Sequence, residues 1–214
     1  DQHRASYGSV ASAPMTLLLV DTGVAILEKL DGSVQIKDVI QRGLLNFVDA
    51  LSLREEKVGI CAYSSKATTA LAFTSNAADV RKAVFDLIAE TESSSFTLSI
   101  KGAVDSVYAH TLARQSCQVV LVTTSALTDV TAAFLKTFRL TCYLNLLRVH
   151  VVYASARLPA GADARANLPH KRLADACFGS CYFVDLNDHP KSLKPAFSAL
   201  LRQHCEFPGC TWRS

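Results

Sequence analysis

The chain has 214 residues, half of them hydrophobic and 19% charged, with 22 Lys and Arg residues against 19 Asp and Glu residues. This composition is typical of one folded, soluble domain and excludes a disordered chain. The net charge of +3 is spread without a basic run, so we expect no direct nucleic-acid binding. No apolar run approaches the roughly 20 residues of a membrane helix, and residues 1–14 do not read as a signal peptide.

Strand-like and helix-like patterns alternate along the chain. Short apolar runs predict six strands, at residues 16–20, 57–63, 68–73, 118–123, 149–153 and 182–186. Apolar residues at helical spacing predict helices over 36–51, 80–88, 100–108, 134–142, 173–177 and 193–201. Ser75 or Asn76 is the expected N-cap of the second helix, and residues 159–167 are expected to form a long loop.

The spacing of the strands sets their directions. Only residues 64–67 separate the second and third predicted strands, which is too short for a parallel crossover, so these two form an antiparallel hairpin. The other strands are separated by helices, which favours parallel pairing. We therefore predict an α/β, Rossmann-like fold with a six-stranded, mostly parallel sheet, one antiparallel edge strand and helices on both faces. Residues 1–14 form an N-terminal extension, 15–203 the domain and 204–214 a C-terminal tail.

The sequence lacks the common catalytic and nucleotide-binding motifs. Asp21 closes the first strand, and the loop after it holds only Gly23, so neither a G-x-G-x-x-G turn nor a P-loop is present. There is no G-x-S-x-G turn, and no cysteine at a strand end has an evident histidine partner. We expect no catalytic residue, no cofactor and no enzymatic activity.

The seven cysteines fall into two groups. The odd number, and the apolar setting of Cys61, Cys117 and Cys142, favour free thiols in a reducing compartment. The remaining cysteines could form two disulfides or, together with His204, a zinc site; they are Cys177, Cys181, Cys205 and Cys210. Their spacing differs from the common C-x2-C pattern, so buried thiols and a loose tail are favoured.

The Asp at the end of the first strand, the early hairpin and the pattern of six strands resemble a von Willebrand factor A domain. That family holds a divalent cation with an Asp-x-Ser-x-Ser loop, a Thr from a second loop and an Asp from a third. The resemblance places these positions at Asp21, Gly23, Ala25, Ser94 and Thr124, with Ser95 or Thr97 as alternatives to Ser94. Only Asp21 keeps a carboxylate, so we expect a degenerate site without a functional metal; Asp129 is the single nearby carboxylate that could rescue it.

Residues 118–186 resemble, in short motifs, the A-domain subunits of TFIIH that partner the XPD helicase. The motifs lie at 125–128, 147–152, 154–156 and 173–174, with Gly179 and Tyr182 following. The resemblance implies a nuclear, non-catalytic regulator in transcription and nucleotide-excision repair that docks on an XPD-like helicase and other subunits of its complex. The implied contact residues are Ser125, Ala126, Leu127, Thr128 and Asp129.

Leu127 leaves two interpretations open. As an apolar residue in a polar loop it could anchor a partner, and a charged residue there would then leave the fold intact. It could instead fold back against a helix.

Two other functions remain open. One is an extracellular adhesion or ligand-binding A domain with an altered cation site, with a disulfide between Cys177 and Cys181 or between Cys205 and Cys210. The other is the A domain of a proteasomal ubiquitin receptor.

Overall fold

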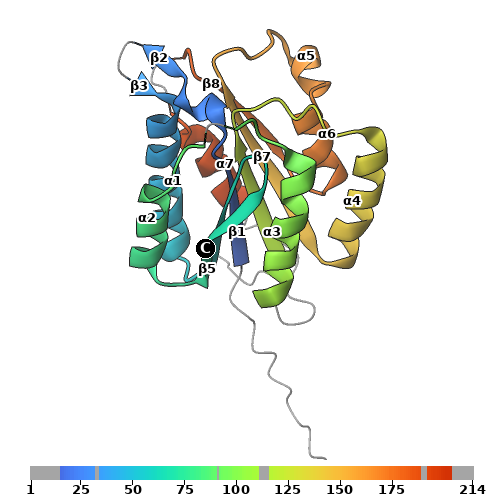
Figure 1. Cartoon of the computed structure of the whole chain (residues 1–214). Helices are drawn as coiled ribbons and strands as arrows, with labels where there is room; N and C mark the ends of the chain where they lie inside the picture. Colours follow the sequence, from blue (N-terminus) through green and yellow to red (C-terminus); the bar gives the residue numbers. More distant parts are fainter. Residues whose placement is uncertain (1–14, 32–33, 91, 111–115, 189–191, 204–214) are drawn as a thin grey trace, which may run out of the picture.

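A six-stranded sheet in the order β5-β4-β1-β6-β7-β8 forms the centre of the molecule (Figure 1). The computed structural model describes residues 15–31, 34–90, 92–110, 116–188 and 192–203. The strands of this sheet are β1 (Met15–Asp21), β4 (Lys57–Tyr63), β5 (Ala67–Thr74), β6 (Cys117–Thr123), β7 (Leu147–Ser155) and β8 (Cys181–Asp185). All neighbours pair in parallel except β5, which runs antiparallel to β4 at the edge. The predicted fold class is confirmed.

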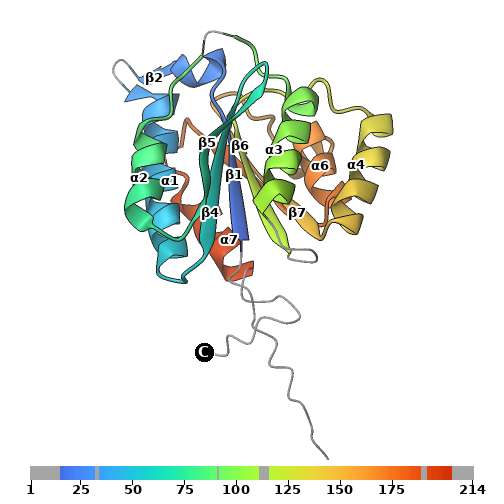
Figure 2. The same ribbon diagram turned by 60° about the horizontal axis from the view of Figure 1, so that its bottom comes forward.

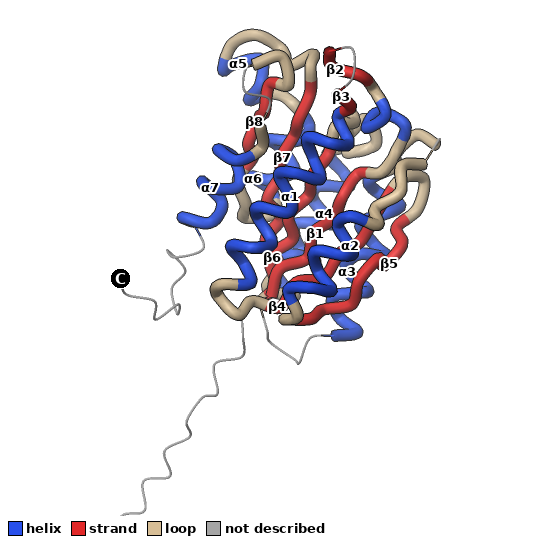
Figure 3. Tube along the Cα trace, turned by 90° about the vertical axis from the view of Figure 1, so that its left-hand side faces the viewer, coloured by secondary structure: helices blue, strands red, loops and turns tan. Residues whose placement is uncertain are grey.

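Helices cover both faces of the sheet (Figure 3). One face carries α1 (Ile36–Ser52), α2 (Ala77–Phe85) and α7 (Lys194–Gln203), and the other carries α3 (Phe96–His110), α4 (Ala132–Leu144) and α6 (Pro169–Ala176). On this second face α4 contacts α3, through the rings of Phe96 and Phe134, and also α6; Figure 2 shows the three helices on the same side of the sheet. Each face therefore buries its own hydrophobic cluster between sheet and helices.

The alternation of side chains along the strands divides the core into these two clusters. In β1, Leu17 and Leu19 belong to the cluster under α3, α4 and α6, whereas Leu18 and Val20 belong to the cluster under α1, α2 and α7. All seven residues of β1 are buried, because β1 pairs with both β4 and β6 and helices cover both its faces. Parallel strands buried in this way read as continuous apolar runs.

Several local expectations change. The helix predicted over 80–88 is α2, and it ends at Phe85, where the Gln41 side-chain amide donates to the carbonyls of Val84 and Phe85. Asn76 is its N-cap and accepts a hydrogen bond from the Ala78 amide.

The long loop expected at 159–167 is wrong in part. Its middle forms the short helix α5 (Ala162–Ala166), because alanine and arginine are strong helix formers. The sequence patterns also missed the 3-10 helix η1 (Val24–Leu27) and the small antiparallel pair β2 (Lys29–Asp31) and β3 (Val34–Gln35). Among the described residues, no helix combines the length and apolar character needed to cross a bilayer.

Candidate functional site

The loops that follow β1, β6 and β7, together with the segment that precedes α3, meet at the carboxyl edge of the sheet; we call this surface the loop face. In parallel α/β sheets this edge is where ligands bind. Asp21, the last residue of β1, lies at its centre and is completely buried. The interactions of Asp21 therefore decide what this surface can bind.

Protein groups surround both oxygens of the Asp21 carboxylate. Oδ1 accepts hydrogen bonds from the Gly23 amide, at 3.0 Å, and from the Ser94 hydroxyl. Oδ2 accepts from the Thr123 hydroxyl at 2.9 Å and from the amides of Thr124 and Ser125 at 3.3 and 3.2 Å. Five donors thus stabilise the buried charge within the chain.

Gly23 shows why the loop closes on Asp21. A Cβ atom added at Gly23 would lie 2.2 Å from the Ser94 hydroxyl oxygen and 3.1 Å from the Glu92 carbonyl oxygen. The Ser94 hydroxyl therefore fills the space that a side chain at position 23 would need. The sequence analysis identifies Gly23 as a position that lacks a ligand oxygen. It does not predict that the Ser94 hydroxyl occupies the space beside Gly23.

The Asp129 carboxylate binds residues at the start of α3 and not the groups around Asp21. Its Oδ2 accepts hydrogen bonds from the Ser95 hydroxyl at 3.0 Å and from the amide and hydroxyl of Thr97, both at 2.8 Å. Because Thr97 is the second residue of α3, Asp129 supplies the acceptor that the free amides of a helix start require. Asp129 thus holds α3 against the loop after β6.

The residues present do not fit a divalent cation. Gly23 and Ala25 have no side-chain oxygen, and the Asp21 oxygens are occupied in part by backbone N–H groups, which cannot ligate a metal. Nowhere in the described part of the chain do three His, Cys, Asp or Glu side chains gather closely enough to hold a metal ion. Ser94, and not Ser95 or Thr97, is the hydroxyl that reaches Asp21.

Leu127 is not an exposed anchor. Its side chain is 2% exposed and belongs to the core cluster under α3 and α4, so the folded-back interpretation is correct and a charged residue there would enter the core. Ala126 and Thr128 on either side of it are exposed, whereas Ser125 and Asp129 are partly buried. Ala126 and Thr128 are the residues of this predicted contact that face solvent.

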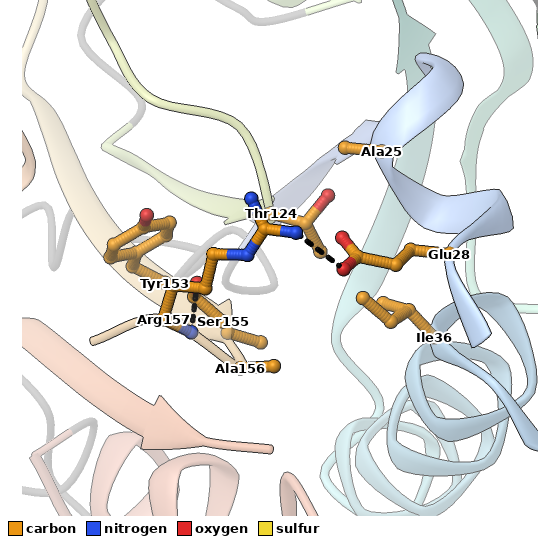
Figure 4. Close-up of a pocket in the computed structure, with 9 residues that line it drawn as sticks. Ala25, Glu28, Ile36, Thr124, Tyr153, Ser155, Ala156 and Arg157 are labelled. Carbon is orange, nitrogen blue, oxygen red and sulfur yellow. Dashed lines mark hydrogen bonds and ion pairs between the residues drawn. The ribbon is translucent and has the colours of Figure 1, made fainter. Parts of the chain in front are cut away.

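A small pocket opens between the segment after β1 and the end of β7 (Figure 4). It measures about 180 Å³ and lies between Ala25, Glu28 and Ile36 on one side and Thr124 and Arg157 on the other. Arg157 and Glu28 reach toward each other across it and form an ion pair at 3.2 Å. Pockets that enclose small-molecule substrates are usually larger, so this one suits at most a single side chain.

His170 links α6 to the loop after β6. Its Nε2 lies 3.0 Å from the Ser125 carbonyl oxygen, and its ring stacks on Tyr153 with centroids 3.7 Å apart. Burial lowers the pKa of His170 to about 4, although the Ser125 carbonyl and Asp21 oppose the shift. The ring is therefore neutral at physiological pH and donates from Nε2. No sequence motif predicted this role for His170.

The five described cysteines are free thiols. Cys177 hydrogen-bonds Cys142, and this contact, together with burial, raises the pKa of the Cys177 thiol. Burial raises the pKa values of Cys117 and Cys181 to about 12. The first of the two disulfides that the adhesion alternative offered, between Cys177 and Cys181, is not formed in this structure. His204, Cys205 and Cys210 lie outside the described residues.

The comparisons with known proteins identify the fold. No family model matches the sequence, and neither does any curated protein. The structure is similar to BatB from Bacteroides thetaiotaomicron, at a TM-score of 0.65 and 15% identity, covering 91% of this chain and 98% of that one.

Two further similar structures are named as von Willebrand domains. The VWA domain of SpRpn10 has a TM-score of 0.61 and 12% identity, over 94% of this chain and 100% of that one. The vWF domain of the pilus tip protein Mfa5 from Porphyromonas gingivalis has a TM-score of 0.67 and 10% identity, over 96% and 99%. With its six-stranded sheet and single antiparallel edge strand, this chain has the von Willebrand factor A fold.

Proposed function

We propose that this chain is a non-catalytic protein-interaction module that binds its partner through the loop face without a bridging cation. The observation that carries this proposal is the Asp21 carboxylate, which is saturated by five donors of its own chain. A carboxylate whose two oxygens accept these five hydrogen bonds leaves no ligand set for an ion. Contact with a partner then depends on exposed side chains such as Ala126 and Thr128.

The chemistry of the buried groups supports a non-catalytic role. His170 is stacked and neutral, and the amide of Ser180 donates to Nδ1 of His150. The raised pKa values of Cys117 and Cys181 keep these thiols protonated, whereas a nucleophilic cysteine needs a thiolate.

The finer proposal is a regulatory or scaffold subunit of a TFIIH-like complex that docks on an XPD-like helicase in the nucleus. The short motif matches between residues 118 and 186 support it, and the five free thiols fit a reducing compartment. The helicase and the compartment both come from the resemblance.

A binding measurement tests both levels of the proposal. A purified XPD-like helicase is immobilised, and binding of the chain is measured in 5 mM magnesium and in EDTA by biolayer interferometry. We expect equal affinity in both buffers, and a loss of about tenfold or more for Ala126→Glu or Thr128→Glu, which place a charge in a desolvated contact. Leu98→Glu, a change at an exposed residue of α3, is the matched control.

Different results would reject different parts of the proposal. Binding that is lost in EDTA would overturn the cation-independent mode. Absence of binding to the helicase would remove the TFIIH assignment. The similarity to the SpRpn10 domain favours a proteasomal receptor domain as the second candidate, so purified proteasome is the second analyte in the same measurement.

A further inference from the structure

Large apolar side chains are exposed to solvent at the end of α4 and in the turn between α6 and β8. We call Leu140, Tyr143, Leu144, Leu146 and Phe178 the α4 patch. Tyr143 and Leu144 are each 67% exposed and Leu140 is 57% exposed. The rings of Tyr143 and Phe178 lie 6.5 Å apart, so the side chains of two separate segments form one surface. Contiguous exposed apolar surface of this kind marks an interaction site.

The backbone at this patch adds a second observation. Leu146 and Phe178 follow the C-caps of α4 and α6, with φ of 52° and 60°. Glycine or asparagine is the usual residue at such positions, because a side chain is strained in the left-handed region. Both helices instead end in a bulky residue, at least 42% exposed. Glycine would relieve the backbone strain at both positions, so the backbone itself does not favour these bulky side chains.

The charged residues of α4 are both basic. No Asp or Glu occurs between Asp129 and Asp163, a stretch that includes all of α4 and β7. Lys136 and Arg139 are exposed on α4, and the Arg139 guanidinium carbon lies 5.5 Å from the centre of the Phe178 ring. The carboxylate of Asp175 on the adjacent helix α6 is paired with Lys171.

We propose that the α4 patch binds an acidic amphipathic segment of a partner protein, with the apolar side of that segment on Tyr143, Leu144 and Phe178 and its carboxylates on Arg139 and Lys136. Apolar anchors surrounded by complementary charge give both affinity and orientation. The patch lies at the amino edge of the sheet, where β7 and β8 begin, whereas the loop face lies at the carboxyl edge. It is therefore a second surface, independent of the loop face.

Two synthetic peptides test this assignment. Both have Leu at i, i+3, i+4 and i+7 with Ala between them; one carries Glu at the flanking positions and the other carries Lys. Binding to the whole chain is measured by fluorescence anisotropy at low and at high salt. We expect the Glu peptide to bind about tenfold more tightly than the Lys peptide, with a difference that shrinks as salt rises.

Variants of the chain place the binding on the patch. The double change Arg139→Glu with Lys136→Glu should reverse the preference between the peptides, and Leu144→Ser should weaken the binding of both. Leu98→Ser is the control, because Leu98 is 72% exposed on α3. Leu146→Gly should weaken binding while the midpoint of thermal unfolding stays the same or rises, since glycine removes the strain at φ 52°.

Four outcomes would overturn the assignment. Two concern the peptides: the Glu peptide does not bind at about 1 mM, or the two peptides bind with equal affinity. The third is that Leu98→Ser weakens binding as much as Leu144→Ser does. The fourth is that the chain forms a dimer in sedimentation and Leu144→Ser dissociates it. Binding that requires removal of residues 204–214 would assign the patch to that segment of the same chain. Each result leaves the loop-face proposal standing, because that proposal is tested with changes at the other edge of the sheet.

Discussion

Gly23 is the residue at which this chain departs most clearly from a cation-binding loop. The atoms around Gly23 leave no room for a serine, so this one substitution should not restore a cation site. We expect Gly23→Ser to lower the free energy of unfolding by about 1–3 kcal/mol, as overpacked sites do, because its Cβ would meet the Ser94 hydroxyl at 2.2 Å. We also expect no gain of metal affinity. Urea unfolding with and without magnesium or manganese measures both.

Ala25→Ser is the matched control for that experiment. Ala25 is partly exposed and lines the pocket that Glu28 and Arg157 span, so an added hydroxyl should change stability by less than about 0.5 kcal/mol. A Gly23→Ser protein that magnesium stabilised would show that the loop can reopen around an ion.

His170 gives the molecule a defined acid sensitivity. Its pKa is about 4 in the folded chain and near 6.5 when unfolded, so the unfolded state binds more protons between these values. Stability is therefore complete above pH 6.5 and falls as the pH drops toward 4. By linkage the loss from this group is about 3 kcal/mol.

The variant His170→Gln isolates this contribution, since its amide can still donate to the Ser125 carbonyl but does not titrate. Urea unfolding at pH 7.5 and pH 4.5 should show a smaller difference between the two pH values for the variant than for the wild type. Equal pH dependence in both proteins would mean that the pKa of His170 is the same in the folded and the unfolded chain.

In the loop after β6, one residue is buried in the core and its neighbours are exposed. Leu127→Asp should destabilise the chain by about 3–5 kcal/mol, because it removes a core side chain and buries a charge; Leu127 is 2% exposed. Ala126→Asp, at an exposed position of the same loop, should stay within about 0.5 kcal/mol of wild type. Thermal and urea unfolding compare the pair, and similar stabilities would place Leu127 outside the core.

Some elements of this fold can be predicted from the sequence, and others cannot. The apolar runs of β1, β6 and β7 are buried on both faces, so they predict strands at once. The connection between β4 and β5 is too short for a parallel crossover, so it fixes the hairpin. Leu127 could not be assigned, because an apolar residue in a polar loop has the same pattern whether it packs on α3 and α4 or faces a partner. Asp21 was placed correctly, but its contact with Ser94 joins residues far apart in sequence and depends on the folded loops.

At the scale of the whole molecule, the number of free thiols distinguishes a reducing compartment from an oxidising one. We expect seven free thiols by reaction with Ellman's reagent in denaturant without reductant, one for each cysteine in the sequence. In the native protein the five described thiols should react slowly, because four are buried and Cys181 is partly buried. A denatured count of five or fewer would support the disulfide-containing adhesion alternative instead.

The position of β1 in the sheet has a consequence for biosynthesis. This strand is the first that the structure describes, yet it lies between β4 and β6, and all seven of its residues are buried. A nascent polypeptide that has emerged only as far as β5 therefore presents one edge of its most apolar strand unpaired until residues 117–123 leave the ribosome. We therefore expect a fragment that stops before β6 to aggregate.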